Sequence, residues 1–578
     1  MKNSSTAIFA ALFVLAGCAQ DSPEPPKDEP TAIIADAVYT NGKIYTVNET
    51  QPWAEAVAIK DGKFIVVGSA TEMQAVTGDA TEVIDLGGQF VMPGLVDTHT
   101  HPFDSSFQIL DQLILDNPQS LQDVQQQVVA YAEANPDKEW ILGLSWPKGM
   151  FPGENPHRSM LDEAVAETPI CLMDQGGHAN WCNTKALEIT GIMDPDFEVP
   201  ANGIVERDED GVPSGTIRET TIGHVKNFTP KASAELYAQA IDYVQDLFLS
   251  KGVTAHRTAE GDENDLIALK AKADAGEIKL HWAVGMNVNF AQSTYTIEER
   301  MQQIANRSQY ASEFVNPNFA KIFLDADVSG YGIWMLEPFP GTDDNYGQPV
   351  VDVQDLNRWT TELDKQGISV QYHAIGSASI AAVADALEVA AEANGGKLKT
   401  RHYPDHNGLP TARDLERFAR LTGLVGYAPY FAFEFPSIHA SYAEFLGTEA
   451  LAKLQPARDT IDAGAMIATG TDFSSLPQDP WPLLEGMVHR RNPWVPESES
   501  TPNNASQAIT VEEAIKVYTL WGAHALLAED KIGSIETGKY ADFVVLDRNL
   551  LETPIDDIDS TEVLKTIFSG KVVFEYSE

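Results

Sequence analysis

The chain has 578 residues and a mass of 63.1 kDa, so we expect a large barrel with insertions, or two to three domains. Hydrophobic residues make up 43%, which suits a globular protein with a substantial core. The formal net charge of -46, from 85 acidic and 39 basic side chains, argues against nucleic acid as a partner, because a phosphate backbone would be repelled.

The first residues have the pattern of a secretory leader. Lys2 precedes an apolar run over residues 7–16, which is too short to span a bilayer as a mature helix. We therefore expect residues 1–17 to be a signal peptide. Beyond this leader, the sequence contains no candidate transmembrane segment.

The end of the leader, Leu15-Ala16-Gly17-Cys18, resembles the lipobox of bacterial lipoproteins, in which the cysteine is acylated. Ala19 follows in place of the aspartate that holds such proteins at the inner membrane, so the resemblance implies a lipid anchor on the outer membrane, facing the periplasm. Residues 18–31 are polar and proline-rich, as in a tether. Plain secretion, with Cys18 lost or idle, is the alternative. The anchor would be the chain's contact with the membrane.

Two further cysteines, Cys171 and Cys182, leave two interpretations open. They can pair in an oxidising compartment, or Cys171 can be a free thiol buried in the apolar run PICLM. The sequence has no CxxC pair, so a thiolate zinc site is not expected.

Both ends of the chain show short β-strands separated by turn signals. In residues 32–90, Asn41-Gly42 and Asp61-Gly62 each lie between β-rich runs and predict hairpins. Residues 521–578 alternate strands with glycine turns in the same way. We expect the two terminal segments to build one small β-sandwich domain together.

Residues 91–520 alternate apolar β-rich runs with helical periodicity. This many strand–helix repeats favours an α/β fold with a closed (β/α)8 TIM-type barrel. A typical barrel needs about 250 residues, so the surplus must lie in insertions. Loop signals place the main insertion at about residues 104–229.

The stretch VMPGLVDTHTHPFD contains two histidines with one residue between them, His99 and His101. Side chains on a strand alternate faces, so both imidazoles point the same way. Active sites of β/α barrels lie at the carboxyl ends of the strands, where an apolar strand delivers this pair. The spacing therefore predicts that the two histidines share one metal ion.

The segment GLVDTHTHP resembles the first-strand metal motif of the amidohydrolase superfamily. Four further stretches follow in the order that the superfamily uses: FAKIFLDADVSG, YHAIG, RHYPDH and ATGTDFSS. Together they resemble a subgroup of large metal-dependent amidohydrolases related to N-substituted formamide deformylases and exoenzyme regulatory proteins. The resemblance covers nearly all of the chain after the tether.

The resemblance implies one or two zinc ions, or another divalent metal, in the barrel. It implies that Lys321 is carbamylated and bridges two cations, which would remove the unfavourable burial of an ammonium group in an apolar strand. The alternative is a lysine that reaches solvent or pairs with Asp325. Asp472 would also act as the general base and then pass the proton to the leaving group. The implied metal ligands are His99, His101, Lys321, His373, His406 and Asp472.

Substrate contacts are predicted at His178, whose surroundings resemble the subgroup's insertion, and at Trp146 and Trp181, which lie in or next to expected loops. Packing of these rings within the insertion is the alternative. The chain departs from the subgroup where Tyr-Pro-Asp precedes His406 in place of Arg-Ile-Glu, and where Ser377 follows Gly376 in place of Asp.

The expected function is hydrolysis of an amide-type C–N bond in a small molecule, an N-acyl or aryl amide, by metal-activated water. One rival keeps the metal but cleaves an ester, lactone or phosphoester. Another is a non-catalytic envelope lipoprotein with a retained barrel. The sequence leaves the substrate, the number of metal ions and the oligomeric state open.

Overall fold

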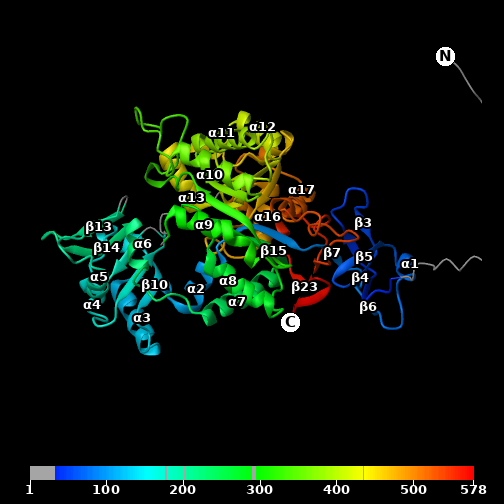
Figure 1. The fold of residues 1–578 in the computed structure, drawn as a ribbon, viewed down its shortest axis with the longest axis horizontal. Helices are drawn as coiled ribbons and strands as arrows, with labels where there is room; N and C mark the ends of the chain where they lie inside the picture. Colours follow the sequence, from blue (N-terminus) through cyan, green and yellow to red (C-terminus); the bar gives the residue numbers. More distant parts are fainter. Residues whose placement is uncertain are drawn as a thin grey trace, which may run out of the picture.

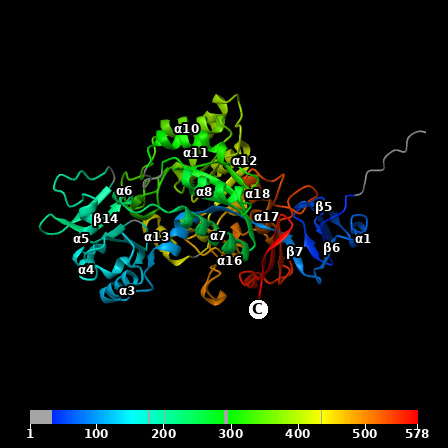
Figure 2. The ribbon, with the colours of Figure 1, turned by 60° about the horizontal axis from the view of Figure 1, so that its bottom comes forward.

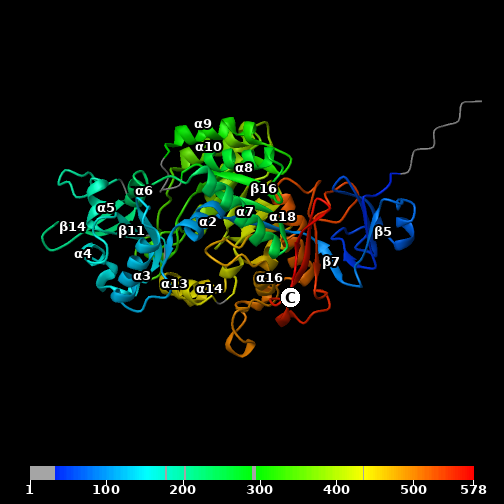
Figure 3. The ribbon, with the colours of Figure 1, turned by 90° about the horizontal axis from the view of Figure 1, so that it is seen from below.

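The computed structural model describes residues 33–577 except residues 176, 178, 201–202, 290–294 and 434. The predicted leader, the predicted lipidation site Cys18, the tether and His178 therefore lie outside the described residues. Three parts lie in a row, with a β/α barrel in the middle (Figures 1, 2 and 3). Among the described residues, none of the helices combines the length and the apolar character needed to span a bilayer.

The barrel is built from eight parallel strands of the described chain, in a six-stranded and a two-stranded sheet. The strands are β8 (Leu95–Thr100), β15 (Val253–Gly261), β16 (His281–Asn287), β17 (Val315–Phe323), β18 (Ser369–Ala374), β19 (Tyr403–His406), β20 (Leu424–Tyr427) and β21 (Met466–Thr469). β19 lies against β20, and a parallel bridge between Thr100 and Phe473 joins the ends of β8 and β21. The ring confirms the predicted barrel fold.

Helices cover the outside of the barrel. In α7 (Ala234–Ser250), one buried face is formed by Ala240, Ile241, Val244 and Phe248, and the Ser233 side chain caps the helix start. The helices are α2 (Pro102–Asp111), α7 (Ala234–Ser250), α8 (Glu263–Asp274), α9 (Ile297–Asn306), α10 (Val353–Lys365), α11 (Ser377–Ala393), α12 (Ala412–Leu421), α13 (Pro436–Leu446), α14 (Thr448–Leu451), α15 (Ala457–Asp462), α16 (Pro480–His489), α17 (Val511–Val517) and α18 (Leu520–Ala525).

Both terminal segments contribute to a pair of β-sheets at one end of the molecule (Figure 1). One sheet holds β5 (Lys63–Gly68), β4 (Ala56–Lys60), β1 (Ala37–Thr40) and β6 (Glu82–Asp85), next to α1 (Ala70–Met73). The other holds β24 (Lys571–Glu575), β23 (Val563–Phe568), β22 (Phe543–Leu546), β7 (Phe90–Pro93), β2 (Lys43–Tyr45) and β3 (Trp53–Ala54). Because β22 pairs with β7, the two ends of the chain share one sheet.

Only one of the two predicted hairpin turns forms a hairpin. Asp61-Gly62 joins β4 and β5, and both turn residues have the positive φ that this tight turn requires. The prediction at Asn41-Gly42 is wrong, because β1 and β2 belong to different sheets. Each strand finds its partners elsewhere in the chain, so the turn carries the backbone from one sheet to the other.

The inserted domain has its own six-stranded sheet at the opposite end of the molecule (Figure 1). Its strands are β13 (Gly203–Arg207), β14 (Pro213–Glu219), β12 (Ala179–Cys182), β11 (Ile170–Asp174), β10 (Ile141–Trp146) and β9 (Leu113–Ile114). Its helices include α3 (Leu121–Ala134), α4 (Ser159–Asp162), α5 (Thr184–Ile189) and α6 (Thr220–Lys226). The domain has two apolar clusters, both separate from the core of the barrel.

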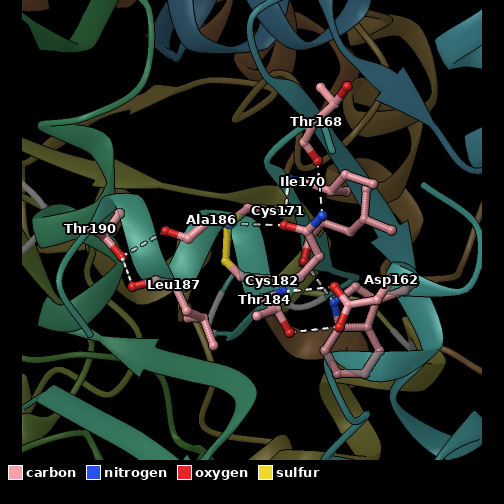
Figure 4. The surroundings of a disulfide bond; sticks show 12 residues. Asp162, Thr168, Ile170, Cys171, Cys182, Thr184, Ala186, Leu187 and Thr190 are labelled. Atoms are coloured by element: carbon pink, nitrogen blue, oxygen red, sulfur yellow. Dashed lines mark hydrogen bonds between the residues drawn. A yellow bond between two sulfur atoms is a disulfide. The ribbon is translucent and has the colours of Figure 1, made fainter. Parts of the chain in front are cut away.

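The two cysteines that the sequence left open form a disulfide (Figure 4). Cys171 on β11 and Cys182 on β12 are directly opposite each other in an antiparallel pair, with their Cα atoms 4.1 Å apart. Both are buried. The bond therefore ties two strands in the middle of the inserted sheet.

Candidate metal centre

The first strand of the barrel ends at a pair of imidazoles. All six residues of β8, His99 among them, are buried, and His101 follows one residue after the strand ends at Thr100. His101 is the N-cap residue of α2, and Pro102, which lacks a backbone N–H, is the first residue of that helix. As the period-two spacing predicts, the rings lie side by side, with their centroids 5.1 Å apart.

Three ligand atoms meet at the barrel mouth. The Nε2 atoms of His99 and His101 are 3.2 Å apart, and Oδ1 of Asp472 lies 3.3 Å from the first and 2.9 Å from the second. A tetrahedral zinc ion with bonds of about 2.0–2.1 Å holds its ligand atoms about 3.4 Å apart. The triangle therefore has the size and the donor chemistry of one face of a divalent metal site.

Each of the two histidines is also held from behind by a carboxylate. Nδ1 of His99 makes a hydrogen bond to Oδ2 of Asp405, and Nδ1 of His101 lies 3.4 Å from Oε2 of Glu260. A carboxylate that accepts the Nδ1–H directs the lone pair of Nε2 toward a metal. Both imidazoles thus present Nε2 to the same point, next to Asp472.

The carboxylates of this cluster favour a positive charge between them. Burial would lower the pKa of His101, but Glu260 and Asp472 outweigh burial and raise it to about 10. Burial would raise the pKa of Asp472, but His99 and His101 hold it well below its usual range. Without a metal, the imidazolium of His101 supplies the positive charge among the carboxylates. A divalent ion bound to Nε2 would take the place of that proton.

Asp472 is positioned by the strand that carries the histidines. Its backbone N–H donates to the carbonyl of His99, and its φ is 56°, a conformation that a non-glycine residue adopts only where neighbours impose it. Next to it, Thr471 donates both its backbone N–H and its hydroxyl to Asp97, two residues before His99. Asp97 thus ties the turn after β21 to β8.

The second carboxylate oxygen of Asp472 has a specific donor. Tyr430, in the loop after β20, donates its hydroxyl to Oδ2 of Asp472 at 2.6 Å. Tyr430 is 6% exposed. Oδ1 of Asp472 therefore faces the histidine pair while Oδ2 faces the phenol.

Lys321 from β17 lies behind the cluster. It is 1% exposed, so the alternative of a lysine reaching solvent is wrong, and its nearest acid is Asp405, with Nζ 3.5 Å from Oδ2. The alternative partner, Asp325, instead accepts the backbone N–H groups of Ile375 and Gly376. Burial lowers the pKa of Lys321.

His406 and His373 form a second group of imidazoles at the same mouth. Their ring centroids are 4.5 Å apart, and His406 also packs at 5.0 Å from His99. Nδ1 of His406 is buried and has no hydrogen-bond partner among the described residues. A buried nitrogen of this kind is expected to bind a metal or a water molecule. His99, Asp405 and His406 therefore make a second grouping with metal-ligand chemistry.

A third acidic and imidazole cluster lies away from the mouth, at Glu485, His489 and Asp556. Its hydrogen bonds argue against a metal. Nδ1 of His489 accepts the backbone N–H of Arg491 at 3.0 Å, so Nε2 carries the proton, which it donates to Glu485 at 2.9 Å. Both ring nitrogens are occupied, so the imidazole belongs to a hydrogen-bond network.

The two tryptophans predicted to contact substrate are buried within the inserted domain. The indole N–H of Trp146 donates to the carbonyl of Leu172, and that of Trp181 donates to the carbonyl of His157. Phe151 packs edge-on against both rings. This placement favours the packing alternative for both residues. His178, the third predicted contact, lies outside the described residues.

Three residues of the site were not in the predicted ligand set: Asp405, Glu260 and Tyr430. Asp405 stands directly before His406, in a position that the sequence marked only as a departure from the subgroup. Glu260 is the next-to-last residue of β15, a strand on which the sequence predicted no site residue. A carboxylate at the carboxyl end of a barrel strand is the signal that would have found both acids.

Comparisons with known proteins agree with this geometry. The model of the amidohydrolase family, Amidohydro_3, matches residues 82–574. N-substituted formamide deformylase of Arthrobacter pascens is 25% identical over 93% of this chain and 98% of its own, and the Bacillus subtilis protein YtcJ is 27% identical over 94% and 100%. An uncharacterised metal-dependent hydrolase from Pyrococcus horikoshii has the same fold, with a TM-score of 0.72 and 22% identity over 90% of this chain and 99% of that one.

With a matching family model over most of its length, a barrel of the same fold and a histidine–aspartate cluster at the barrel mouth, the chain belongs to the amidohydrolase family, in the subgroup of YtcJ and N-substituted formamide deformylase, and is a metal-dependent hydrolase.

Proposed function

We propose that the protein hydrolyses an amide-type C–N bond of a small molecule with a zinc ion held by His99, His101 and Asp472. Two imidazoles and a carboxylate are ligands that zinc prefers, and three protein ligands leave a position open, as in catalytic zinc sites. Such an ion would polarise the scissile carbonyl and lower the pKa of water from about 15.7 toward 7.

Asp472 carries the proton transfer in this proposal. Water gives a proton to Oδ2 of Asp472 as its oxygen attacks the carbonyl carbon, and a tetrahedral intermediate forms. Asp472 then returns that proton to the nitrogen, the C–N bond breaks, and an acid and an amine leave. The observation that supports the proposal most strongly is that Oδ1 of Asp472 faces the histidine pair while Oδ2 accepts the Tyr430 hydroxyl.

Tyr430 complements this cycle. Its hydroxyl donates to Oδ2 before the reaction, and that acceptor weakens once Oδ2 has taken up the proton. The O–H group then becomes available to the oxygen of the tetrahedral intermediate. A neutral phenol suits this role, since burial raises the pKa of Tyr430, and Asp472 raises it further.

We also propose that Lys321 is carbamylated. Burial favours the neutral amine, which can attack carbon dioxide and lose a proton to give a carbamate. The new carboxylate would provide a ligand near Asp405 and His406 for a second ion. Mass spectrometry of the peptide that contains Lys321 tests this, because the added mass should be present under mildly alkaline conditions and absent after acid treatment.

A substrate panel tests the reaction. Anilides and N-alkyl amides are compared with matched phenyl esters, lactones and phosphotriesters, using enzyme purified without chelator and reconstituted with zinc. We expect amide turnover that chelation abolishes and zinc restores. Turnover restricted to esters or phosphotriesters would replace the amide assignment, and no turnover of any class would support the non-catalytic alternative.

A further inference from the structure

A cavity of about 140 Å³ lies next to the metal centre. His101 belongs to both, so a molecule bound at the metal centre can extend into the cavity. The walls come from the carboxyl ends of β15 and β16, from α2 and α7, from the starts of α8 and α9, and from Lys226 in α6 of the inserted domain. Its charged lining residues other than His101 are Asp104, Glu260, Asp262 and Asp265 on the acidic side and Lys226 and Arg300 on the basic side.

The lining has more acidic than basic groups, four carboxyl groups against two bases besides His101. Burial raises the pKa of Tyr237, and so do Asp265, Asp262 and Asp104. Burial and the neighbouring carboxylate of Asp262 likewise raise the pKa of Asp265 well above its ordinary value. The neighbouring carboxylates therefore add to the effect of burial on both pKa values, as expected where like charges lie close together.

Some of these acids have structural roles, and one does not. Asp262 and Asp265 form a capping box at the start of α8, and Glu260 supports His101. Asp104 is exposed and lines the cavity, with no side-chain hydrogen bond or ion pair among the described residues. It lies in the first turn of α2; burial raises the pKa of its carboxyl group, and the charges of Lys226 and His101 oppose that rise.

Two buried polar groups at the cavity also lack partners. Asn287, 5% exposed, has an Oδ1 atom with no hydrogen-bond donor among the described residues. Arg300, 2% exposed, lies 4.7 Å over the ring of Tyr295 and has no acceptor for Nε or Nη1 in that same part of the chain. Buried groups of this kind normally have a partner, so their placement points to a polar ligand.

We propose that this cavity binds a positively charged end of the substrate, an ammonium or guanidinium group, while the scissile amide lies at the metal centre. The cation would contact Asp104 and donate to Oδ1 of Asn287, and Arg300 would donate to an oxygen atom of the same molecule. The proposal rests on the proposed amide hydrolysis and adds a substrate class to it: amides with a basic group on the acyl or the amine side.

Two pairs of amides of matched shape test the proposal with the zinc-loaded full chain. On the acyl side, alanine anilide is compared with isobutyranilide; on the amine side, N-acetylputrescine is compared with N-pentylacetamide. We expect kcat/KM to favour the cationic member of at least one pair by about tenfold or more. In Asp104→Asn that ratio should fall toward one. Asp116→Asn, which removes an exposed carboxylate outside the cavity, should keep the ratio of the unsubstituted protein.

A binding measurement separates this proposal from the amide assignment. Calorimetry with propylammonium chloride, against propanol as the neutral probe, should show binding that Asp104→Asn weakens about tenfold. If propylammonium binds in this way but no amide is hydrolysed, the cavity assignment stands and the amide reaction is wrong. If both members of each pair are hydrolysed equally and propylammonium does not bind, the cavity assignment is wrong and amide hydrolysis stands. If neither turnover nor binding is seen, both are wrong.

Discussion

The barrel mouth and the inserted domain both bury side chains, but those at the mouth are polar or charged and those in the inserted domain are mainly apolar. The mouth gathers histidines, carboxylates and a lysine from strands far apart in the sequence, and its polar atoms are arranged around a point that a cation can occupy. The inserted domain encloses two apolar clusters, and a disulfide between neighbouring strands lies in one of them. We therefore expect substitutions in the two regions to have different effects.

The largest effect is expected at the histidine pair. His101→Ala removes one vertex of the ligand triangle, so metal content should fall and activity should drop by about 10⁴-fold or more. Metal analysis with kinetics of the purified variant checks this. His489→Ala is the matched control, since its imidazole lies in the cluster whose ring nitrogens are both occupied; it should keep the metal. Retention of metal in the first variant and loss in the second would reverse the assignment.

Asp472→Asn should separate metal binding from proton transfer. The amide oxygen can still occupy the position of Oδ1, but the residue can no longer take a proton from water. We expect the metal to be retained and kcat to fall by about 10²–10⁴-fold. Single-turnover kinetics on metal-loaded protein measures this. Metal loss with unchanged turnover per bound ion would show that Asp472 is only a ligand.

Tyr430→Phe should lower kcat by about 10²-fold with little change in stability, because it removes one donor aimed at the reacting groups. Tyr427→Phe provides the matched control on the same strand and loop, since its hydroxyl bonds to Thr460 at 2.6 Å, away from the cluster. That variant should lose about 1 kcal/mol of stability and keep kcat. Equal kcat values for the two variants would remove Tyr430 from the mechanism.

Removing the disulfide should affect the other region. Cys171→Ser with Cys182→Ser opens a cross-link between residues 11 apart in sequence, and should destabilise the inserted domain by about 2–4 kcal/mol. Urea unfolding with and without reductant measures the change. The metal content of the folded double variant should equal that of the unsubstituted protein, and a loss of metal would show that the two regions are coupled.

The smallest effect is expected at Glu529, beside α18, which binds Arg401 through two hydrogen bonds of 2.7 Å. Burial opposes ionisation, but hydrogen bonds to His524 and Arg401 lower the pKa of Glu529 from 4.5 to about 2. A depressed folded-state pKa gives stability above pH 4.5 that is lost as pH falls toward 2. Glu529→Gln should remove about 1 kcal/mol at neutral pH and flatten this acid dependence, as unfolding at several pH values would show. An unchanged acid slope would contradict the pairing.

The sequence predicted the barrel and the direction of its histidines well, because strand periodicity and strand-end placement are local properties. His99 and His101 needed only the alternation of a strand and the stop at Pro102. The sequence could not identify Asp405, Glu260 and Tyr430 as residues of the metal centre, because their contacts depend on which strands become neighbours. Trp146 and Trp181 were predicted to contact substrate but pack inside the inserted domain, because an aromatic ring near a turn suits a core as well as a pocket. The pairing of Cys171 with Cys182 likewise depended on strand register.

Diffraction at the zinc absorption edge from crystals of the zinc-loaded chain would locate the metal ion. We predict an anomalous peak about 2.0–2.1 Å from Nε2 of His99, Nε2 of His101 and a carboxylate oxygen of Asp472. A peak at Glu485 and His489 in its place, or a fully loaded chain with no ion at the barrel mouth, would contradict it.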